Sequence, residues 1–190
     1  MEDNLIMVNF CLKEEEKNLL KSLIGKKLIK YRHDPLDKFG GETVYGRVEL
    51  FFEDAIILID YDYEAYPLFG NTVDDHPKFS VKIIKEEEAT SALQNTSQIN
   101  IKFDEILTSI TLVEEYANVD WGGKKDDVRI LTAIIFKFGN KEIALQGDYM
   151  IPLVDIIKGE NTREKLSKPG EEFDNDPETK FTVTRDFIGL

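Results

Sequence analysis

The chain has 190 residues, of which 42% are hydrophobic and twelve are Phe, enough to bury a sizeable core. Its formal net charge of −13 argues against binding to nucleic-acid phosphate and to anionic membrane surfaces, both of which rely on clustered Lys and Arg. The same charge suits basic protein partners, although acidity also serves solubility alone.

The N-terminal stretch MEDNLIMVNFCLKEEEK lacks the cationic start and the long apolar core of a secretory signal. No stretch approaches the ~20 apolar residues of a membrane span. Cys11 is the single cysteine, which excludes an internal disulfide and fits a reducing compartment. We therefore expect a cytoplasmic protein.

The first predicted element is an amphipathic helix within residues 12–24, with acidic residues in its first turn and Gly25 as its stop. Its apolar stripe comprises Leu12, Leu19, Leu20, Leu23 and Ile24.

Residues 42–64 predict a β-hairpin that turns at Glu53-Asp54. The expected pairs are Phe52–Ala55, Leu50–Ile57, Val48–Ile59 and Gly46–Tyr61 on an apolar face, and Arg47–Asp60, Tyr45–Asp62 and Thr43–Glu64 on the other. A second hairpin turns at Gly139-Asn140, with the expected pairs Phe136–Ile143, Ile134–Leu145 and Lys137–Glu142. Residues 152–158 then predict a short helix between Pro152 and Gly159.

Two parts of the chain resemble each other in sequence. Residues 38–68 align with 120–153, and 75–81 align with 176–183, in the same order along the chain. We interpret this as two repeats, about 4–84 and 98–188, joined by a polar linker, 85–97, within a single compact domain, 1–190.

The predicted fold is α+β and predominantly antiparallel β, with two tandem meander-like repeats packed with pseudo-two-fold symmetry around a shared core. The core faces are expected to carry Val48, Leu50, Phe52, Ile57, Ile59, Ile134, Phe136, Ile143 and Leu145.

Asp60, Asp62 and Glu64 alternate along one predicted strand and therefore share a face. The second repeat has Gln146, Asp148 and Met150 at the aligned positions, so a catalytic carboxylate pair is not indicated in both repeats. The ladder is either a solvated strand face or, with Tyr45 and Tyr66, an acidic and tyrosine-rich surface for a basic protein.

The sequence offers two further candidates. Trp121 precedes a Gly-Gly pair, as Phe39 does in the first repeat; each aromatic either plugs the end of a sheet or, for Trp121, anchors a partner. Asp74, Asp75 and His76 are weak metal-ligand candidates, because adjacent residues are hard to aim at one ion and a turn explains them. We predict no metal and no cofactor.

The function favoured by these observations is a non-enzymatic acidic binding protein that engages a basic protein, for example as an immunity or inhibitor protein. One alternative is an enzyme or small-ligand binder with a cleft between the repeats, using Asp62, Asp148 or residues 74–76. The other alternative is a structural subunit of a larger assembly.

Overall fold

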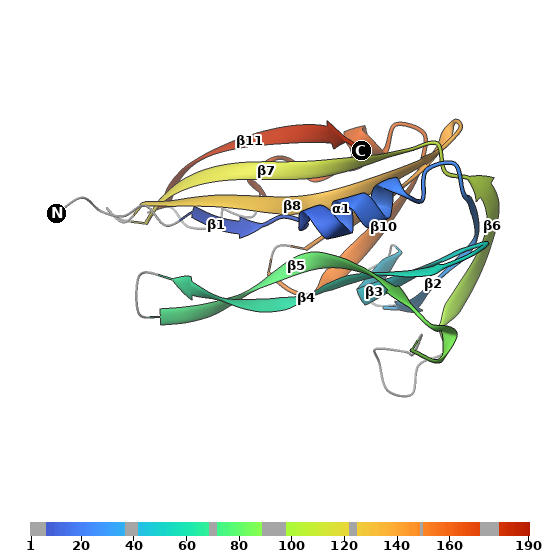
Figure 1. The fold of residues 1–190 in the computed structure, drawn as a ribbon. Coiled ribbons are helices and arrows are strands. Elements are labelled where there is room, and N and C mark those ends of the chain that lie inside the picture. The colour runs from blue at the N-terminus through green and yellow to red at the C-terminus, as the bar shows by residue number, and fades with distance from the viewer. Residues whose placement is uncertain are drawn as a thin grey trace.

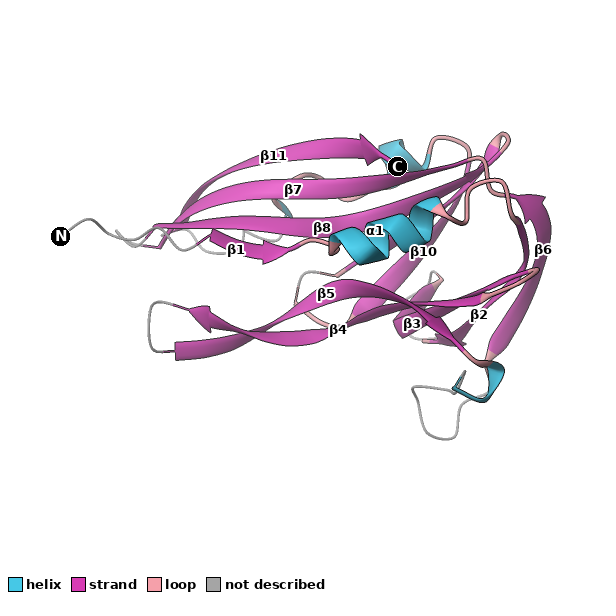
Figure 2. Cartoon of the chain, viewed as in Figure 1, coloured by secondary structure: helices cyan, strands magenta, loops and turns pink. Residues whose placement is uncertain are grey.

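The computed structural model describes residues 7–36, 42–68, 72–88, 98–121, 125–148, 150–171 and 179–190. In this part of the chain, eleven strands form one mostly antiparallel sheet that curls into a half-barrel (Figure 1). A single α-helix and two short 3-10 turns accompany the sheet in the described ranges (Figure 2). The predominantly antiparallel β fold predicted from the sequence is therefore confirmed.

The strands are β1 (Met7–Phe10), β2 (Lys27–Pro35), β3 (Thr43–Phe52), β4 (Ile56–Leu68), β5 (Thr72–Ile84), β6 (Ile99–Ile106), β7 (Ser109–Trp121), β8 (Lys125–Phe138), β9 (Lys141–Gly147), β10 (Leu153–Gly159) and β11 (Thr179–Gly189). The helical elements are α1 (Glu14–Lys21), η1 (Glu86–Glu88) and η2 (Thr162–Lys165).

The main path through the sheet is β11-β7-β8-β9-β10-β3-β2-β6. The hairpin β4–β5 branches from β3, and β1 lies parallel to β8. In Figure 1, β7, β8 and β11 form the upper side of the half-barrel and β4 and β5 form the lower side, with α1 between them.

The predicted N-terminal helix is confirmed. Three glutamates occupy the first turn of α1, where the helix dipole favours negative charge. Leu20 and Leu23 are buried. The helix ends at Lys21 with Ser22 as its C-cap, earlier than the predicted stop, and Gly25 lies in the turn that follows, with φ +88°. The apolar stripe of the helix is thus part of the core of the protein.

The predicted helix at 152–158 is wrong, because this segment forms β10. Val154 and Ile156 are buried while Asp155 between them is exposed, which is the alternation of a strand. β9 and β3 pair with β10 on either side, so two sheet edges supply the hydrogen bonds that a helix would have made internally. Tertiary pairing outweighs the local Pro and Gly signals here.

The second predicted hairpin is confirmed in all three pairs, Phe136–Ile143, Ile134–Leu145 and Lys137–Glu142. The first is confirmed close to its turn, with Leu50–Ile57, Val48–Ile59 and Arg47–Asp60 in register, and the backbone of Phe52 bonded to that of Ala55.

The first hairpin departs from prediction beyond Arg47. Tyr45 lies opposite Leu153 of β10 rather than Asp62, and Thr43 lies opposite Asp155 rather than Glu64. Gly46 has φ +47°, so β3 bends at this position and its remaining edge pairs with β10. The expected Gly46–Tyr61 pair is likewise not part of the β3–β4 ladder.

The segments that suggested a duplication are only partly equivalent in their surroundings. The aligned hairpins are β3–β4 and β8–β9. The aligned third segments differ, because β5 pairs with β4 whereas β11 pairs with β7. The duplication and its pseudo-two-fold symmetry therefore stay predictions.

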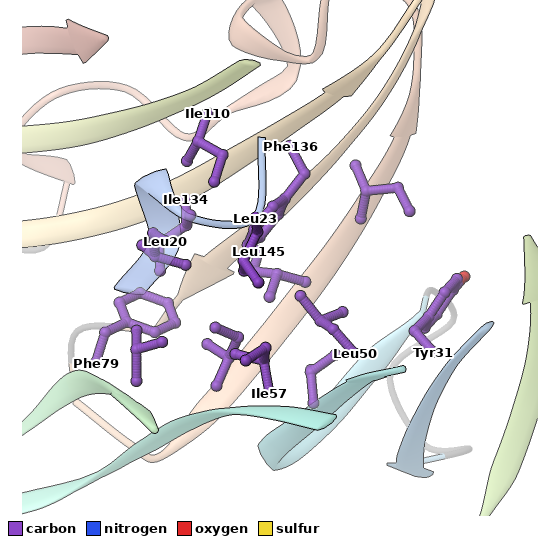
Figure 3. Packing of buried hydrophobic residues seen from close by; sticks show 14 of the residues in the cluster. Leu20, Leu23, Tyr31, Leu50, Ile57, Phe79, Ile110, Ile134, Phe136 and Leu145 are labelled. Atoms are coloured by element: carbon purple, nitrogen blue, oxygen red, sulfur yellow. The ribbon is translucent and has the colours of Figure 1, made fainter. Parts of the chain in front are cut away.

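The core prediction is confirmed. All nine residues expected on the two core faces belong to one buried cluster, which also includes Leu20 and Leu23 of α1 (Figure 3). Burial of these side chains stabilises the fold by roughly 1.5–3 kcal/mol each. Among the described residues, no helix has the length and apolar character that a membrane crossing requires.

Candidate functional site at the forks of the sheet

Two strands change partners part of the way along their length. β8 pairs with β1 over 127–130 and with β9 over 133–138. β3 pairs with β10 over 43–45 and with β4 over 47–51. The sheet therefore forks twice, once at Thr132 and once at Gly46. Where two partner strands diverge at a fork, they leave space between them that the strands do not fill.

Tyr61 of β4 connects the two forks. Its side chain is buried, and its hydroxyl donates a hydrogen bond to the carbonyl oxygen of Asp148 at 2.5 Å. A Cβ on Gly147 would lie 2.7 Å from both Cε2 and the hydroxyl oxygen of Tyr61, so only glycine allows this approach. Phe79 packs on the Tyr61 ring with a centroid distance of 4.5 Å. The branching hairpin is thus fixed to the end of β9.

A pocket of about 470 Å³ lies at the Thr132 fork. Its walls come from β4, β7, β8, the end of β9 with the following loop, β10 and the segment after η2. The lining residues are Tyr61, Glu115, Ile130, Thr132, Gln146, Gly147, Asp148, Met150, Ile151, Asp155, Ser167 and Glu171. We call this space the fork pocket.

A buried ion pair forms one wall of the fork pocket. Glu115 is 1% exposed, and its Oε1 accepts a hydrogen bond from Nε of Arg185 at 2.7 Å. The amide of Gly170 donates to the other oxygen at 3.1 Å, and Arg185 also donates to the carbonyl oxygen of Ser167 at 2.7 Å. Gln146 bonds to the side chain and amide of Ser167 as well. These contacts hold the segment 167–170 against the sheet.

The other acidic residues of the lining use only one carboxylate oxygen in hydrogen bonds among the described residues. Oδ1 of Asp148 accepts from the amides of Met150 and Ile151 at 2.9 and 3.2 Å. Oδ1 of Asp155 accepts from the hydroxyl of Thr43 at 2.5 Å. Oε2 of Glu171 accepts from the amide of Lys168 at 3.1 Å. One acceptor oxygen on each side chain is left for a ligand or water.

Exposed apolar side chains lie in the strands and the loop next to the fork pocket. They are Tyr45 (38% exposed), Tyr63 (46%), Met150 (72%) and Ile151 (43%), which we call the apolar rim. The hydroxyl of Tyr63 donates to the carbonyl oxygen of Met150 at 3.1 Å. Tyr45 lies opposite Leu153, whose amide bonds to the carbonyl oxygen of Ile151. The rim therefore combines residues of β3, β4 and the loop before β10, and two of them, Met150 and Ile151, also line the pocket.

The acidic ladder lies on the opposite face of β4 from Tyr61, as strand alternation requires. Asp60 is half-buried opposite Arg47, and burial raises the pKa of its carboxyl despite the attraction of Arg47. Asp62 is exposed opposite Lys78, and Glu64 forms an ion pair with Lys78. Cations are thus interleaved with the three acids.

The remaining predicted residues are spread over the molecule. Trp121 ends β7 and Tyr66 lies in β4, but the side chains of both fall outside the described part, as do both Gly-Gly pairs. Asp75 is exposed and His76 is buried, stacked on Phe10 with centroids 4.3 Å apart. The two therefore face different surroundings.

The side chain of Asp74 lies outside the described residues. Among those described, no group of three His, Cys, Asp or Glu residues could hold a metal ion.

A second polar cluster joins β2 to β10. Glu42 accepts a hydrogen bond from the hydroxyl of Tyr31 at 3.1 Å, forms an ion pair with Lys158 and lies 3.3 Å from Nε2 of His33. Burial alone would raise the pKa of Glu42, but the contacts with His33 and Lys158 outweigh it and lower the pKa. Burial, followed by the charge of Glu42, raises the pKa of Tyr31. The cluster ties together strands that are not neighbours in sequence.

The sequence anticipated part of the fork pocket. Asp148 was expected as a polar group in a cleft, and it lines the pocket, whereas Asp62 does not. Tyr61, Glu115 and Glu171 were not singled out, because each resembles an ordinary core or surface position. No sequence signal marks Met150 and Ile151, because their exposure follows from the fold and single exposed apolar residues are common.

Comparison with known proteins assigns no relationship: no protein-family model, no curated protein and no solved structure matches the chain.

Proposed function

We propose that this protein is a non-enzymatic binding protein that engages a basic protein through the apolar rim and the fork pocket. The observation that carries the proposal is the rim itself, in which two tyrosines, a methionine and an isoleucine are exposed in the segments next to the fork pocket. Aromatic residues and Met are enriched at the centres of protein interfaces, where they supply most of the binding energy.

The net charge of −13 supports a basic partner. A strong charge of one sign accelerates the encounter with a protein of opposite charge, while contacts at the centre of the interface set the lifetime of the complex. An inhibitor that neutralises a toxin or nuclease, as an immunity protein does, is the most concrete form of this function.

In this proposal the acidic ladder guides the partner rather than anchoring it. Asp62 and Glu64 are exposed and lie in the same strand as Tyr63 of the rim, but on the other face. Asp60 is half-buried beside Arg47 and is expected to contribute least. Tyr66 and Trp121 are proposed as further contacts on the sequence argument alone.

We also propose that the two hairpins arose by duplication and are related by a pseudo-two-fold axis. The support is the ordered sequence match together with the contribution of both hairpins to one core cluster. On this view the fork pocket lies between the repeats, with Tyr61 from the first and Gly147 from the second.

A small molecule is the second candidate occupant, because the pocket volume of about 470 Å³ lies within the range of ordinary ligand sites. A small-ligand binder would need the pocket but not the rim residues Tyr45 and Tyr63, which do not line it. Substitutions at Tyr45 or Tyr63 therefore distinguish the two functions, whereas Met150 belongs to both the rim and the pocket.

The test is affinity capture from a lysate of the source cells with the intact protein, in low salt and in roughly 0.5 M salt, where the Debye length is about 4 Å. The rim variants are Tyr63→Lys and Met150→Lys, and the matched control is Ile83→Lys, an isoleucine that is 61% exposed on β5 and outside the rim.

We expect one basic protein that both rim variants lose and the control retains. Dissociation constants measured with that protein should rise for the rim variants mainly through faster dissociation. Asp62→Lys and Glu64→Lys should mainly slow association and weaken its salt dependence. A partner that binds both rim variants with undiminished affinity would contradict the proposal.

A further inference from the structure

We infer that the fork pocket accepts one long cationic side chain, an arginine or a lysine, from the basic partner. This inference rests on the proposed function and specifies which group of the partner enters the site. The observations behind it are the charge of the pocket lining, its apolar surfaces and its connection to the apolar rim.

The charge of the lining selects a cation. Of the twelve lining residues that the structure describes, four are acidic and none is Lys, Arg or His. Glu115 is already neutralised by Arg185. Asp148, Asp155 and Glu171 have no ion pair among the described residues, and each keeps one oxygen that accepts no hydrogen bond from them. An ammonium or guanidinium group, which carries several N–H donors, complements these oxygens.

The apolar part of the lining suits the stem of such a side chain. Tyr61 and Ile130 are buried in the wall, and Met150 and Ile151 belong to both the wall and the rim. Lys and Arg place their methylene groups along apolar surface while the charged end contacts polar groups. A side chain entering past the rim would therefore meet apolar surface first.

Other ligand chemistries fit less well. Phosphate or carboxylate ligands would be repelled by Asp148, Asp155 and Glu171, and the described lining residues include no cation to bind them. A metal ion is not favoured, because the described residues contain no group of three suitable ligands. The apolar rim is continuous with the pocket through Met150 and Ile151, which favours a side chain presented by a protein surface over a free cation.

The probes are Nα-acetyl-arginine amide and Nα-acetyl-lysine amide, with the neutral citrulline amide as a matched control. The chain has three methionines, so ¹³C-methyl methionine labelling gives a simple NMR spectrum in which Met150→Leu assigns the signal at the pocket. We expect the Met150 signal to shift saturably with the cationic amides. The citrulline amide should shift it far less at equal concentration.

Two conservative variants test the carboxylates. Glu171→Gln and Asp155→Asn should each weaken binding of the cationic amides by about tenfold, because a hydrogen bond to a charged group is lost. Glu87→Gln, an exposed change in η1 outside the pocket, is the control and should have no effect. Urea-unfolding midpoints close to that of the wild type would show that the variants remain folded.

The outcomes separate this inference from the proposed function. A protein partner lost in the rim variants, together with no response to either amide, would overturn the inference and leave the function standing. Saturable binding of the cationic amides, with no protein partner found, would contradict the proposed function. It would also contradict the inference that the cation comes from a partner protein. Spermidine binding more tightly than either amide would also overturn the inference, by assigning the pocket to a free polyamine.

Discussion

The ring of Tyr61 lies directly against the backbone of Gly147, although 86 residues separate the two in sequence. This contact fixes the β4–β5 hairpin where the sheet forks. Gly147→Ala would place a Cβ 2.7 Å from Cε2 of Tyr61 and force the ring to move. We expect the free energy of unfolding to fall by about 1–3 kcal/mol, the usual cost of overpacking.

Chemical denaturation of Gly147→Ala measures this effect. Gly189→Ala is the matched control, because a Cβ there would meet nothing within 4 Å. Equal stability of Gly147→Ala and the wild type would show that Tyr61 does not pack tightly on β9.

The buried pair of Glu115 and Arg185 makes a second prediction. Arg185→Leu leaves the carboxylate of Glu115, which is 1% exposed, without its cation, and should lower the free energy of unfolding by about 3–5 kcal/mol. The double variant Glu115→Met/Arg185→Leu should recover part of this loss, since no unpaired charge is left. Urea unfolding of both variants provides the measurement.

Arg163→Leu is the control for that experiment, because Arg163 is exposed and only its contacts with Thr111 and Phe187 are lost. We expect it to change stability by less than about 1 kcal/mol. A double variant as unstable as Arg185→Leu alone would show that the cost comes from lost contacts to Ser167 rather than from the charge.

Asp60 predicts a dependence on pH. Burial raises the pKa of this carboxyl above its usual 3.8, so the folded protein retains the proton to higher pH than the unfolded chain. The stabilisation that this carboxyl contributes is therefore fully present at pH values below its pKa in the unfolded chain. It is lost as the pH rises through its pKa in the folded protein. Asp60→Asn should be more stable than the wild type at pH 7, and the difference should shrink toward pH 3.

Urea unfolding between pH 3 and pH 7 follows this difference. Asp62→Asn is the control on the same face, and as an exposed position it should change stability less. A wild type that is more stable than Asp60→Asn at pH 7 would mean that the attraction of Arg47 outweighs burial.

Cys11 predicts low thiol reactivity. Burial, followed by the charge of Glu114, raises the pKa of the thiol from 9.0 to about 12. Because the thiolate is the reactive form, a disulfide reagent at pH 8.5 should label the native protein at least about tenfold more slowly than the urea-unfolded chain. Equal labelling rates in the two states would contradict the burial of Cys11.

The same shift affects stability at high pH. A raised thiol pKa stabilises the folded state relative to the unfolded state only while the thiol is protonated in the folded protein. This stabilisation is therefore lost as the pH rises from about 9 toward 12. Relative to Cys11→Ala, the wild type should lose stability across this range. A difference independent of pH would show that the thiol titrates alike in both states.

Local patterns predicted the parts of the fold that depend on neighbouring residues. The turns at Glu53-Asp54 and Gly139-Asn140 set the registers beside them, and alternation placed Ile57 and Ile134 on the core side. The amphipathic stripe located the helix, although α1 ends at Lys21, before the predicted stop at Gly25. In each case the deciding contacts lie within a few residues along the chain.

The features that escaped prediction depend on distant strands. Tyr45 and Thr43 pair with β10, more than 100 residues away; Gly46 inside the strand pattern indicates a bend but does not identify the new partner. Residues 152–158 contain a short apolar run, which suits a helix or a strand equally well until the neighbouring edges are known. The fork pocket arises from these partner changes, so its lining could not be assembled from sequence spacing.

The exchange of partners along β3 also has a consequence for biosynthesis. The apolar face of the first hairpin is complete once residue 59 has been made, but Val154 and Ile156 of β10, which join the same core cluster, are synthesised about 100 residues later. At a synthesis rate of about 5–20 residues per second, this face remains without β10 for roughly 5–20 s. During synthesis, the nascent chain therefore exposes the apolar face of this hairpin, the kind of surface that chaperones bind, until β10 has been made.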